Sequence, residues 1–122
     1  MKRILGIAMA SLLMVNTASI AEAHSTLVSS IPKSGTTIGA VPNLVTLTFN
    51  EKLLVIPGEQ PNSLTVANSS GQSITTGPLK INGSKISITL KSKKSTGKFT
   101  VAYRVVSADG HPISGKYFFT VK

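Results

Sequence analysis

The sequence predicts an all-β domain, a Greek-key β-sandwich or barrel of about seven short strands. Two observations support this fold class. From Ser25 onward, apolar residues alternate with polar ones, which is typical of half-buried antiparallel strands. Gly, Pro, Asn and Ser separate the alternating runs at short intervals, as turn residues do. No stretch beyond residue 23 keeps a 3.6-residue apolar stripe, so no helix is expected there.

The expected strands follow one another along the chain, each ended by a turn. Residues 45–49 alternate Val, Leu and Phe with Thr, and residues 86–90 repeat this pattern. Asn82-Gly83 precedes the second of these runs and predicts a tight hairpin. The other alternating runs cover residues 64–66, 79–81, 99–105 and 117–121.

One apolar segment, Leu53-Leu54-Val55-Ile56, breaks the alternation. We expect it to form a short strand buried on both faces, or a loop tucked under one end of the sandwich. An exposed patch for a partner is the less favoured alternative.

The first 23 residues have the three parts of a secretory signal peptide. Lys2 and Arg3 are followed by an apolar run over residues 4–15 and by the small-x-small sequence Ala21-Glu22-Ala23. The apolar run is too short for a membrane span, which needs about 20 residues. We therefore expect residues 1–23 to be a cleaved Sec-type leader, and residues 24–122 to be an exported domain that begins at His24.

Removal of this leader would change the composition. All three methionines lie within it, and the chain has no cysteine. The domain would therefore lack the soft sulfur ligands that Cu(I) prefers. It would keep 11 basic residues against three acidic ones, a net charge of +8, compared with +9 for the whole chain.

The loop after residue 106 holds the candidate metal ligands. Asp109, the only aspartate, lies two positions before His111, one of two histidines. The other histidine, His24, would be the first residue after cleavage, so that its α-amino nitrogen and its ring nitrogen could chelate one ion. Three nitrogens and one carboxylate oxygen suit Cu(II) in a tetragonal arrangement, and zinc would accept the same atoms tetrahedrally. This site requires that the first strand start at the same end of the sandwich as the Asp109 loop.

Each of these features has a simpler interpretation. Asp109-Gly110 is a common type I′ hairpin turn, His111 could be an ordinary loop residue, and the position of His24 at the new terminus could be a coincidence. The combination of all of them favours the metal site.

The sequence also resembles a known family. His24-Ser-Thr-Leu followed by Ser30-Ile-Pro-Lys-Ser-Gly35, the run Val45 to Glu51, and Tyr103-Arg-Val-Val-Ser-Ala-Asp-Gly-His-Pro-Ile-Ser-Gly115 are similar to the motifs of the CopC family. The resemblance covers essentially the whole chain after the leader, in order. One departure is Ser25, where the family usually has alanine.

The resemblance implies a periplasmic copper-binding protein with an immunoglobulin- or cupredoxin-like β-domain. It implies that His24, Asp109 and His111 bind Cu(II), with Glu51 as a hydrogen-bond partner beside the metal. The methionine-rich loop with which some members bind Cu(I) is missing, which implies a Cu(II)-only member. A CopD-like inner-membrane copper transporter is the implied partner, and we expect a monomer without stable membrane insertion.

The positive charge and two rival functions complete the expectations. Lys91, Lys93, Lys94 and Lys98 cluster around one turn and predict a solvated surface, or else one that docks onto an anionic membrane or an acidic partner. Nucleic acid is not expected for an exported protein whose few aromatic residues lie mostly at core-facing positions of the strands. No catalytic residues are expected. The rivals are a histidine-brace oxidative copper enzyme and a metal-free structural sandwich.

Overall fold

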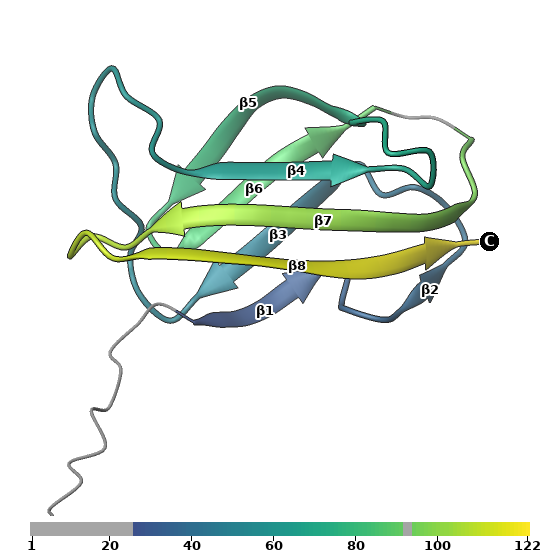
Figure 1. Cartoon of the computed structure of the whole chain (residues 1–122), viewed down its shortest axis with the longest axis horizontal. Coiled ribbons are helices and arrows are strands. Elements are labelled where there is room, and N and C mark those ends of the chain that lie inside the picture. Colours follow the sequence, from purple (N-terminus) through teal and green to yellow (C-terminus); the bar gives the residue numbers. More distant parts are fainter. Residues whose placement is uncertain (1–25, 92–93) are drawn as a thin grey trace, which may run out of the picture.

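The computed structural model describes residues 26–91 and 94–122, which form two packed four-stranded sheets (Figure 1). The expectations for residues 1–23 and for His24 lie outside the described residues. Sheet A has the order β1-β3-β6-β5, and sheet B has the order β2-β8-β7-β4. The strands are β1 Leu27–Ile31, β2 Thr37–Ile38, β3 Leu44–Phe49, β4 Ser63–Ala67, β5 Thr75–Asn82, β6 Lys85–Leu90, β7 Gly97–Val106 and β8 Pro112–Val121. The predicted all-β sandwich is confirmed.

Every predicted run lies inside one of these strands, and two further strands had no alternating signal. In β1 only Ser30 is buried, because this strand is at the edge of sheet A and pairs with β3 alone. The second, β2, has two residues and pairs in parallel with the end of β8. Successive strands change sheets several times, so neighbours in space are often distant in sequence.

The core lies between the two sheets and is formed by the alternate residues of each strand that point inward. On β3, Val45, Leu47 and Phe49 are buried while the threonines between them are half-buried. Phe99 of β7 stacks on Phe119 of β8 with ring centroids 5.2 Å apart. Burial of an apolar side chain of this size contributes about 1.5–3 kcal/mol, so the period-two pattern fixes which face of each strand points inward.

The segment 53–56 is partly buried. Leu53 is 5% exposed and forms a bridge with Ser107, as expected for a loop tucked under the sandwich. Val55 is 66% exposed, so the burial expected there is wrong. The chain leaves the sandwich after Leu54 and returns at Asn62, whose buried side chain donates to the Leu54 carbonyl and accepts from the Val106 N–H.

Candidate metal centre

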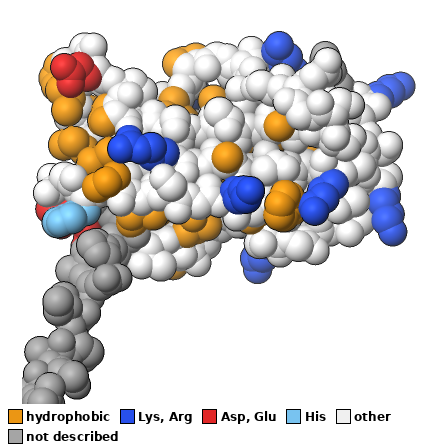
Figure 2. Space-filling model, in the orientation of Figure 1, with side chains coloured by type: hydrophobic (Ala, Val, Ile, Leu, Met, Phe, Trp, Pro, Cys, Tyr) orange, Lys and Arg blue, Asp and Glu red, His pale blue; other side chains and the backbone are white. Residues whose placement is uncertain are grey.

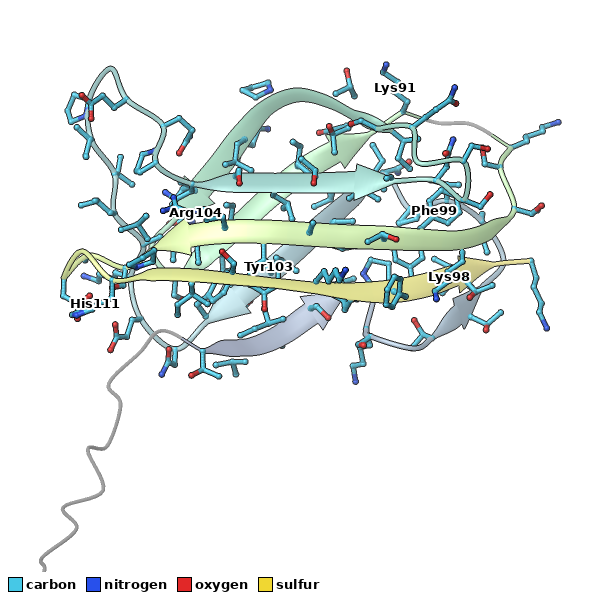
Figure 3. All side chains as sticks on the ribbon, in the orientation of Figure 1. Lys91, Lys98, Phe99, Tyr103, Arg104 and His111 are labelled. Atoms are coloured by element: carbon cyan, nitrogen blue, oxygen red, sulfur yellow. The ribbon has the colours of Figure 1, made fainter. Side chains whose placement is uncertain are left out.

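The β7–β8 hairpin brings the two described candidate ligands together at its tip. The strands pair as far as Val106 and Pro112, which leaves a loop of residues 107–111. The Nδ1 atom of His111 lies 3.0 Å from Oδ1 of Asp109. Both side chains are open to solvent, with 57% of His111 and 50% of Asp109 exposed, and His111 is labelled at the tip in Figure 3.

The loop is not the two-residue type I′ turn that Asp109-Gly110 alone would predict. A type I′ turn needs positive φ at both central residues, and here only Gly110 has it, at 92°. Five residues connect the strands, which gives Asp109 and His111 room to point away from the sheet.

A buried serine organises this loop. The Ser107 side chain is fully buried, and its hydroxyl donates to Oδ1 of Asp109. The N–H of His111 donates to the Ser107 hydroxyl oxygen at 3.3 Å, and the Ser107 N–H donates to the His111 carbonyl at 3.0 Å. The Gly110 N–H donates to the Ser107 carbonyl at 2.8 Å. These bonds fix the relative positions of the carboxylate and the imidazole before any metal arrives.

Sequence reasoning did not assign this role to Ser107. The available signal was a serine two positions before an aspartate, because short polar side chains at that spacing bond to each other and to nearby backbone. Its burial, which turns the hydroxyl into an anchor, could not be seen from the sequence.

The same hydrogen bonds keep Asp109 charged. The hydrogen bond from Ser107, followed by that from His111, lowers the pKa of Asp109 from 3.8 to about 2. A carboxylate that accepts hydrogen bonds holds its charged form more strongly. Asp109 is therefore anionic at neutral pH, as a metal ligand must be.

The distance between the two donors fits a shared metal ion. The 3.0 Å between Nδ1 of His111 and Oδ1 of Asp109 is the distance of a hydrogen bond or ion pair between the two side chains. It also leaves both donor atoms close enough to bind one ion, since donors about 2.1 Å from an ion lie about 3 Å apart at right angles and about 3.4 Å apart in a tetrahedron. Within residues 26–91 and 94–122, no group of three His, Cys, Asp or Glu side chains is arranged so that it could hold a metal ion.

The beginning of the described chain lies at the same end of the sandwich as this loop (Figure 1). The Thr26 N–H donates to the Asn50 side chain at 2.6 Å, and the Asn50 N–H donates to the Thr26 carbonyl at 3.1 Å. Three residues after Asn50, Leu53 pairs with Ser107, and the Ala108 N–H donates to the Lys52 carbonyl. The topological condition for the predicted site is therefore met as far as Thr26.

Glu51 lies within the short segment that joins these two places. It follows Asn50, which is hydrogen-bonded to Thr26. It precedes Lys52, which accepts a hydrogen bond from Ala108 of the loop, and Leu53, which forms a bridge with Ser107. Its side chain is half-buried. This places Glu51 at the same end of the molecule as Asp109 and His111.

Tyr103 and Gly115 face each other across β7 and β8 beneath the loop. The tyrosine ring covers the glycine so closely that a Cβ at Gly115 would overlap the Tyr103 hydroxyl. The ring edge also packs against Phe49, with centroids 5.6 Å apart. These contacts explain why a tyrosine and a glycine stand at these positions, since together they close the core under the site.

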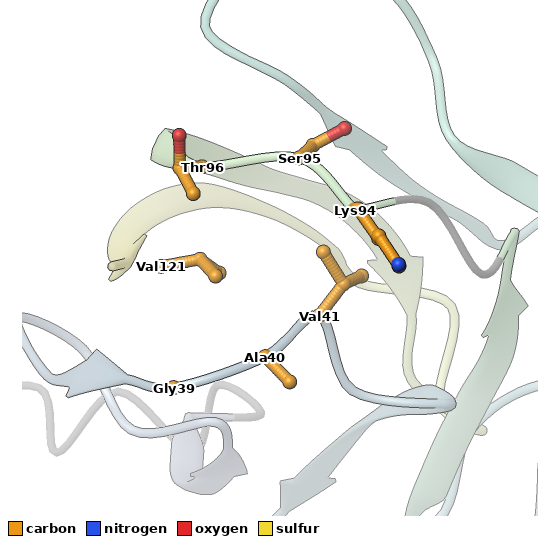
Figure 4. A pocket seen from close by; sticks show the side chains of 7 residues that line it. All are labelled: Gly39, Ala40, Val41, Lys94, Ser95, Thr96 and Val121. Atoms are coloured by element: carbon orange, nitrogen blue, oxygen red, sulfur yellow. The ribbon is translucent and has the colours of Figure 1, made fainter.

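The hollow in Figure 4 is remote from this site. It has a volume of about 260 Å³, and its lining includes Val41, Lys94 and Val121. Val121 ends β8 while His111 precedes its first residue, so the two places are about 30 Å apart along the strand. The candidate site is an exposed loop and not a cleft. No helix among the described residues is long and apolar enough to span a membrane.

Comparison with known proteins agrees with this fold and these motifs. The family model described as "CopC domain" matches residues 27–122. The chain belongs to the CopC family. This confirms the resemblance noted from the sequence motifs.

Among CopC-family relatives, Copper resistance protein C of Xanthomonas campestris pv. juglandis is 34% identical over 108 residues, which cover 82% of this chain and 81% of that protein. The crystal structure of CopC from Methylosinus trichosporium OB3b aligns with a TM-score of 0.65 and 29% identity, over 81% of this chain and 94% of that one. PcoC of Escherichia coli, described as a methionine-rich copper resistance protein, aligns with a TM-score of 0.64 and 28% identity, over 82% of this chain and 100% of that one.

Proposed function

We propose that this CopC-family protein is an exported copper-binding protein of copper resistance, which holds one Cu(II) ion and acts as a carrier or scavenger. The observation that carries the proposal is the Asp109–His111 donor pair, 3.0 Å apart on an exposed loop at the same end of the sandwich as the start of β1. The relatives named copper resistance proteins support copper as the cargo.

The proposed ligands are the α-amino group and imidazole of His24, the carboxylate of Asp109 and the imidazole of His111. Thr26 is fixed to Asn50 at the loop's end of the sandwich. Two residues of chain reach about 7 Å, which keeps a ligand at position 24 near this end. The α-amino pKa near 8 lets a strongly bound divalent ion displace its proton at neutral pH. Three nitrogens and one oxygen favour Cu(II), which is also the most tightly bound divalent ion of its row.

The chain composition argues for Cu(II) alone. Its three methionines all lie within the first 14 residues, and it has no cysteine. The related PcoC is by contrast described as methionine-rich. Without thioether or thiolate ligands in residues 24–122, the protein has no soft site for Cu(I).

The remaining parts of the proposal rest on the resemblance to the family and on the position of residues. Glu51 orients a ligand by hydrogen bonding, as residues beside a metal commonly do. Residues 1–23 are removed on export to the periplasm. A CopD-like inner-membrane transporter receives the copper. The protein is a monomer. It binds copper without catalysing a reaction. A histidine-brace enzyme would need the coordination position that Asp109 takes.

A titration with two forms of the protein tests the N-terminal chelate. One form starts at His24, and the other carries one extra residue before it. We expect the first to bind one Cu(II) tightly, with nitrogen hyperfine structure in its EPR spectrum, and the second to bind more weakly by about 100-fold or more, as expected when a ligand is lost. Equal affinity in the two forms would contradict the proposed role of the terminus.

A further inference from the structure

The outer face of sheet B carries a row of three cations. Lys98 and Arg104 of β7 and Lys116 of β8 are exposed and alternate with buried residues, so they point away from the core. Lys116 pairs with Ala102 and therefore lies between the other two along the sheet. Lys98 and Arg104 are six positions apart, which corresponds to about 20 Å of strand. Figure 3 labels both ends of this row on β7.

An exposed aromatic ring lies in the same row. Phe118 of β8 is 38% exposed and packs under Lys98, whose Nζ atom is 3.9 Å from the ring centroid. Beside them is an open hollow of about 470 Å³, lined also by the turn after β4. The face thus combines positive charge with an apolar group that can leave water.

Acidic residues are segregated from this face. Of the described residues only Glu51, Glu59 and Asp109 are acidic, and none belongs to a strand of sheet B. In Figure 2, which looks onto this face, Lys and Arg are spread across it, whereas Asp and Glu appear only at the end that carries the histidine. The charged side chains on the strands of sheet B are therefore all basic, and such a surface attracts anions.

The predicted lysine cluster is divided by the structure. Lys93 lies outside the described residues. Lys91 and Lys94 belong to the connection between β6 and β7, while Lys98 joins the row on sheet B. The basic surface is therefore better defined by Lys98, Arg104 and Lys116 than by neighbours in sequence.

We propose that the outer face of sheet B adsorbs onto an anionic phospholipid bilayer, the headgroups of which contact the row of cations. The cations are spread over about 20 Å of strand, and only Lys98 lines the hollow, so an extended anionic surface can reach all three, whereas a compact anion reaches one. Phe118 would lie at the boundary between headgroups and acyl chains, as apolar side chains of interfacial proteins do. In this orientation the β7–β8 hairpin lies parallel to the membrane, with Asp109 and His111 at the edge of the contact. The proposal does not depend on copper.

The test is vesicle sedimentation with the metal-free chain from His24 onward, which contains every described strand. Vesicles of phosphatidylglycerol and phosphatidylcholine are compared with phosphatidylcholine alone at physiological ionic strength. We expect binding only to the anionic vesicles, and weaker binding in high salt, because salt screens exposed charges. A cation near an anionic surface contributes about a fivefold factor, so Lys98→Gln/Lys116→Gln should weaken binding by roughly 25-fold.

The matched control is Lys80→Gln/Lys85→Gln, which removes the same charge from exposed positions on sheet A. We expect it to weaken binding by less than about threefold, since these lysines face away from the membrane. Equal loss in the two variants would overturn the proposal in favour of a net-charge effect. Failure to bind anionic vesicles, with or without binding of an acidic peptide, would also overturn it. Unchanged thermal midpoints would show that all variants are folded.

Discussion

Two hairpins of this protein contain the same kind of dipeptide and use it differently. In β5–β6, Asn82 pairs with Lys85, so that Gly83 and Ser84 form a two-residue turn, with φ of 62° at Gly83. In β7–β8, Asp109-Gly110 lies inside a five-residue loop. A short polar residue before glycine signals a chain reversal in both places. Two features distinguish the β7–β8 loop as a candidate metal site. A histidine, His111, follows the glycine, and a buried serine, Ser107, holds the loop from beneath.

The anchor is the clearest difference between the two hairpins. The loop of β7–β8 is held from inside by Ser107 and from outside by backbone hydrogen bonds from Ala108 to Lys52 and from Leu54 to Val106. The turn of β5–β6 has backbone bonds to Phe49 and Leu53. Only the first presents a carboxylate and an imidazole together.

The largest effect on copper affinity is expected from removing a proposed ligand of the β7–β8 hairpin. The matched control removes a turn residue of the β5–β6 hairpin. His111→Ala should weaken Cu(II) binding by more than about 100-fold, because direct ligands matter more than the residues that orient them. Asn82→Ala should leave the affinity unchanged. Competition titrations with a copper chelator measure both. Similar Cu(II) affinities for the two variants would show that His111 of the β7–β8 loop is not a copper ligand.

The next effect comes from the buried anchor. Ser107→Ala should weaken Cu(II) binding by about 10- to 100-fold, because Asp109 and His111 lose the hydroxyl that positions them. It should also lower the free energy of unfolding by about 1–3 kcal/mol. Ser84→Ala in the other turn is the control. The EPR spectrum is the decisive measurement, since a purely structural role for Ser107 would change stability and leave the spectrum of the bound copper as it was.

Substitutions at the turn glycines, Gly83 and Gly110, distinguish the cost of backbone strain from an effect on copper binding. A Cβ at Gly83 or Gly110 would meet nothing within 4 Å, so substitution costs only backbone strain. Gly83→Ala and Gly110→Ala should each destabilise the protein by about 1–2 kcal/mol. Only Gly110→Ala should also weaken copper binding. Urea unfolding combined with copper titration measures both effects, and loss of affinity in Gly83→Ala would contradict the distinction.

The smallest effect is the pH dependence of the metal-free protein. Because the pKa of Asp109 is lowered from 3.8 to about 2 in the folded state, its charged form stabilises the fold. This contribution is fully present above about pH 4 and is lost as the pH falls through about 2. The free energy of unfolding in urea, measured between pH 2 and pH 6, should vary less with pH for Asp109→Asn than for the unchanged protein. Parallel curves would show that Asp109 does not titrate in this way.

The fold could be predicted from the sequence because sheet-forming runs carry their own signal. Val45, Leu47 and Phe49 are all buried, and the threonines between them are not. The edge strand β1 had no such signal, since four of its five residues are not buried. The exposure of Val55 could not be predicted either, because it depends on where the chain leaves the sandwich and not on the hydrophobicity of the residue.

Part of the candidate site could also be predicted. Asp109 and His111 stood out because they are rare residues two positions apart, and the structure brings them together. That the start of β1 lies at the same end depends on strand order, since β1 pairs with β3 and the segment that follows β3 forms a bridge with the loop through Leu53 and Ser107. Local sequence carries no information about that order. The anchor Ser107 depends on burial, which is likewise a property of the packed sandwich.

The proposed copper site is tested most directly by a crystal structure of the chain that begins at His24, loaded with one equivalent of Cu(II). We expect one copper ion bound to the α-amino nitrogen and a ring nitrogen of His24, to a carboxylate oxygen of Asp109 and to a ring nitrogen of His111, with bonds of about 2.0–2.2 Å, as such ligands form with zinc. Copper bound without His24, or bound away from the β7–β8 loop, would contradict it.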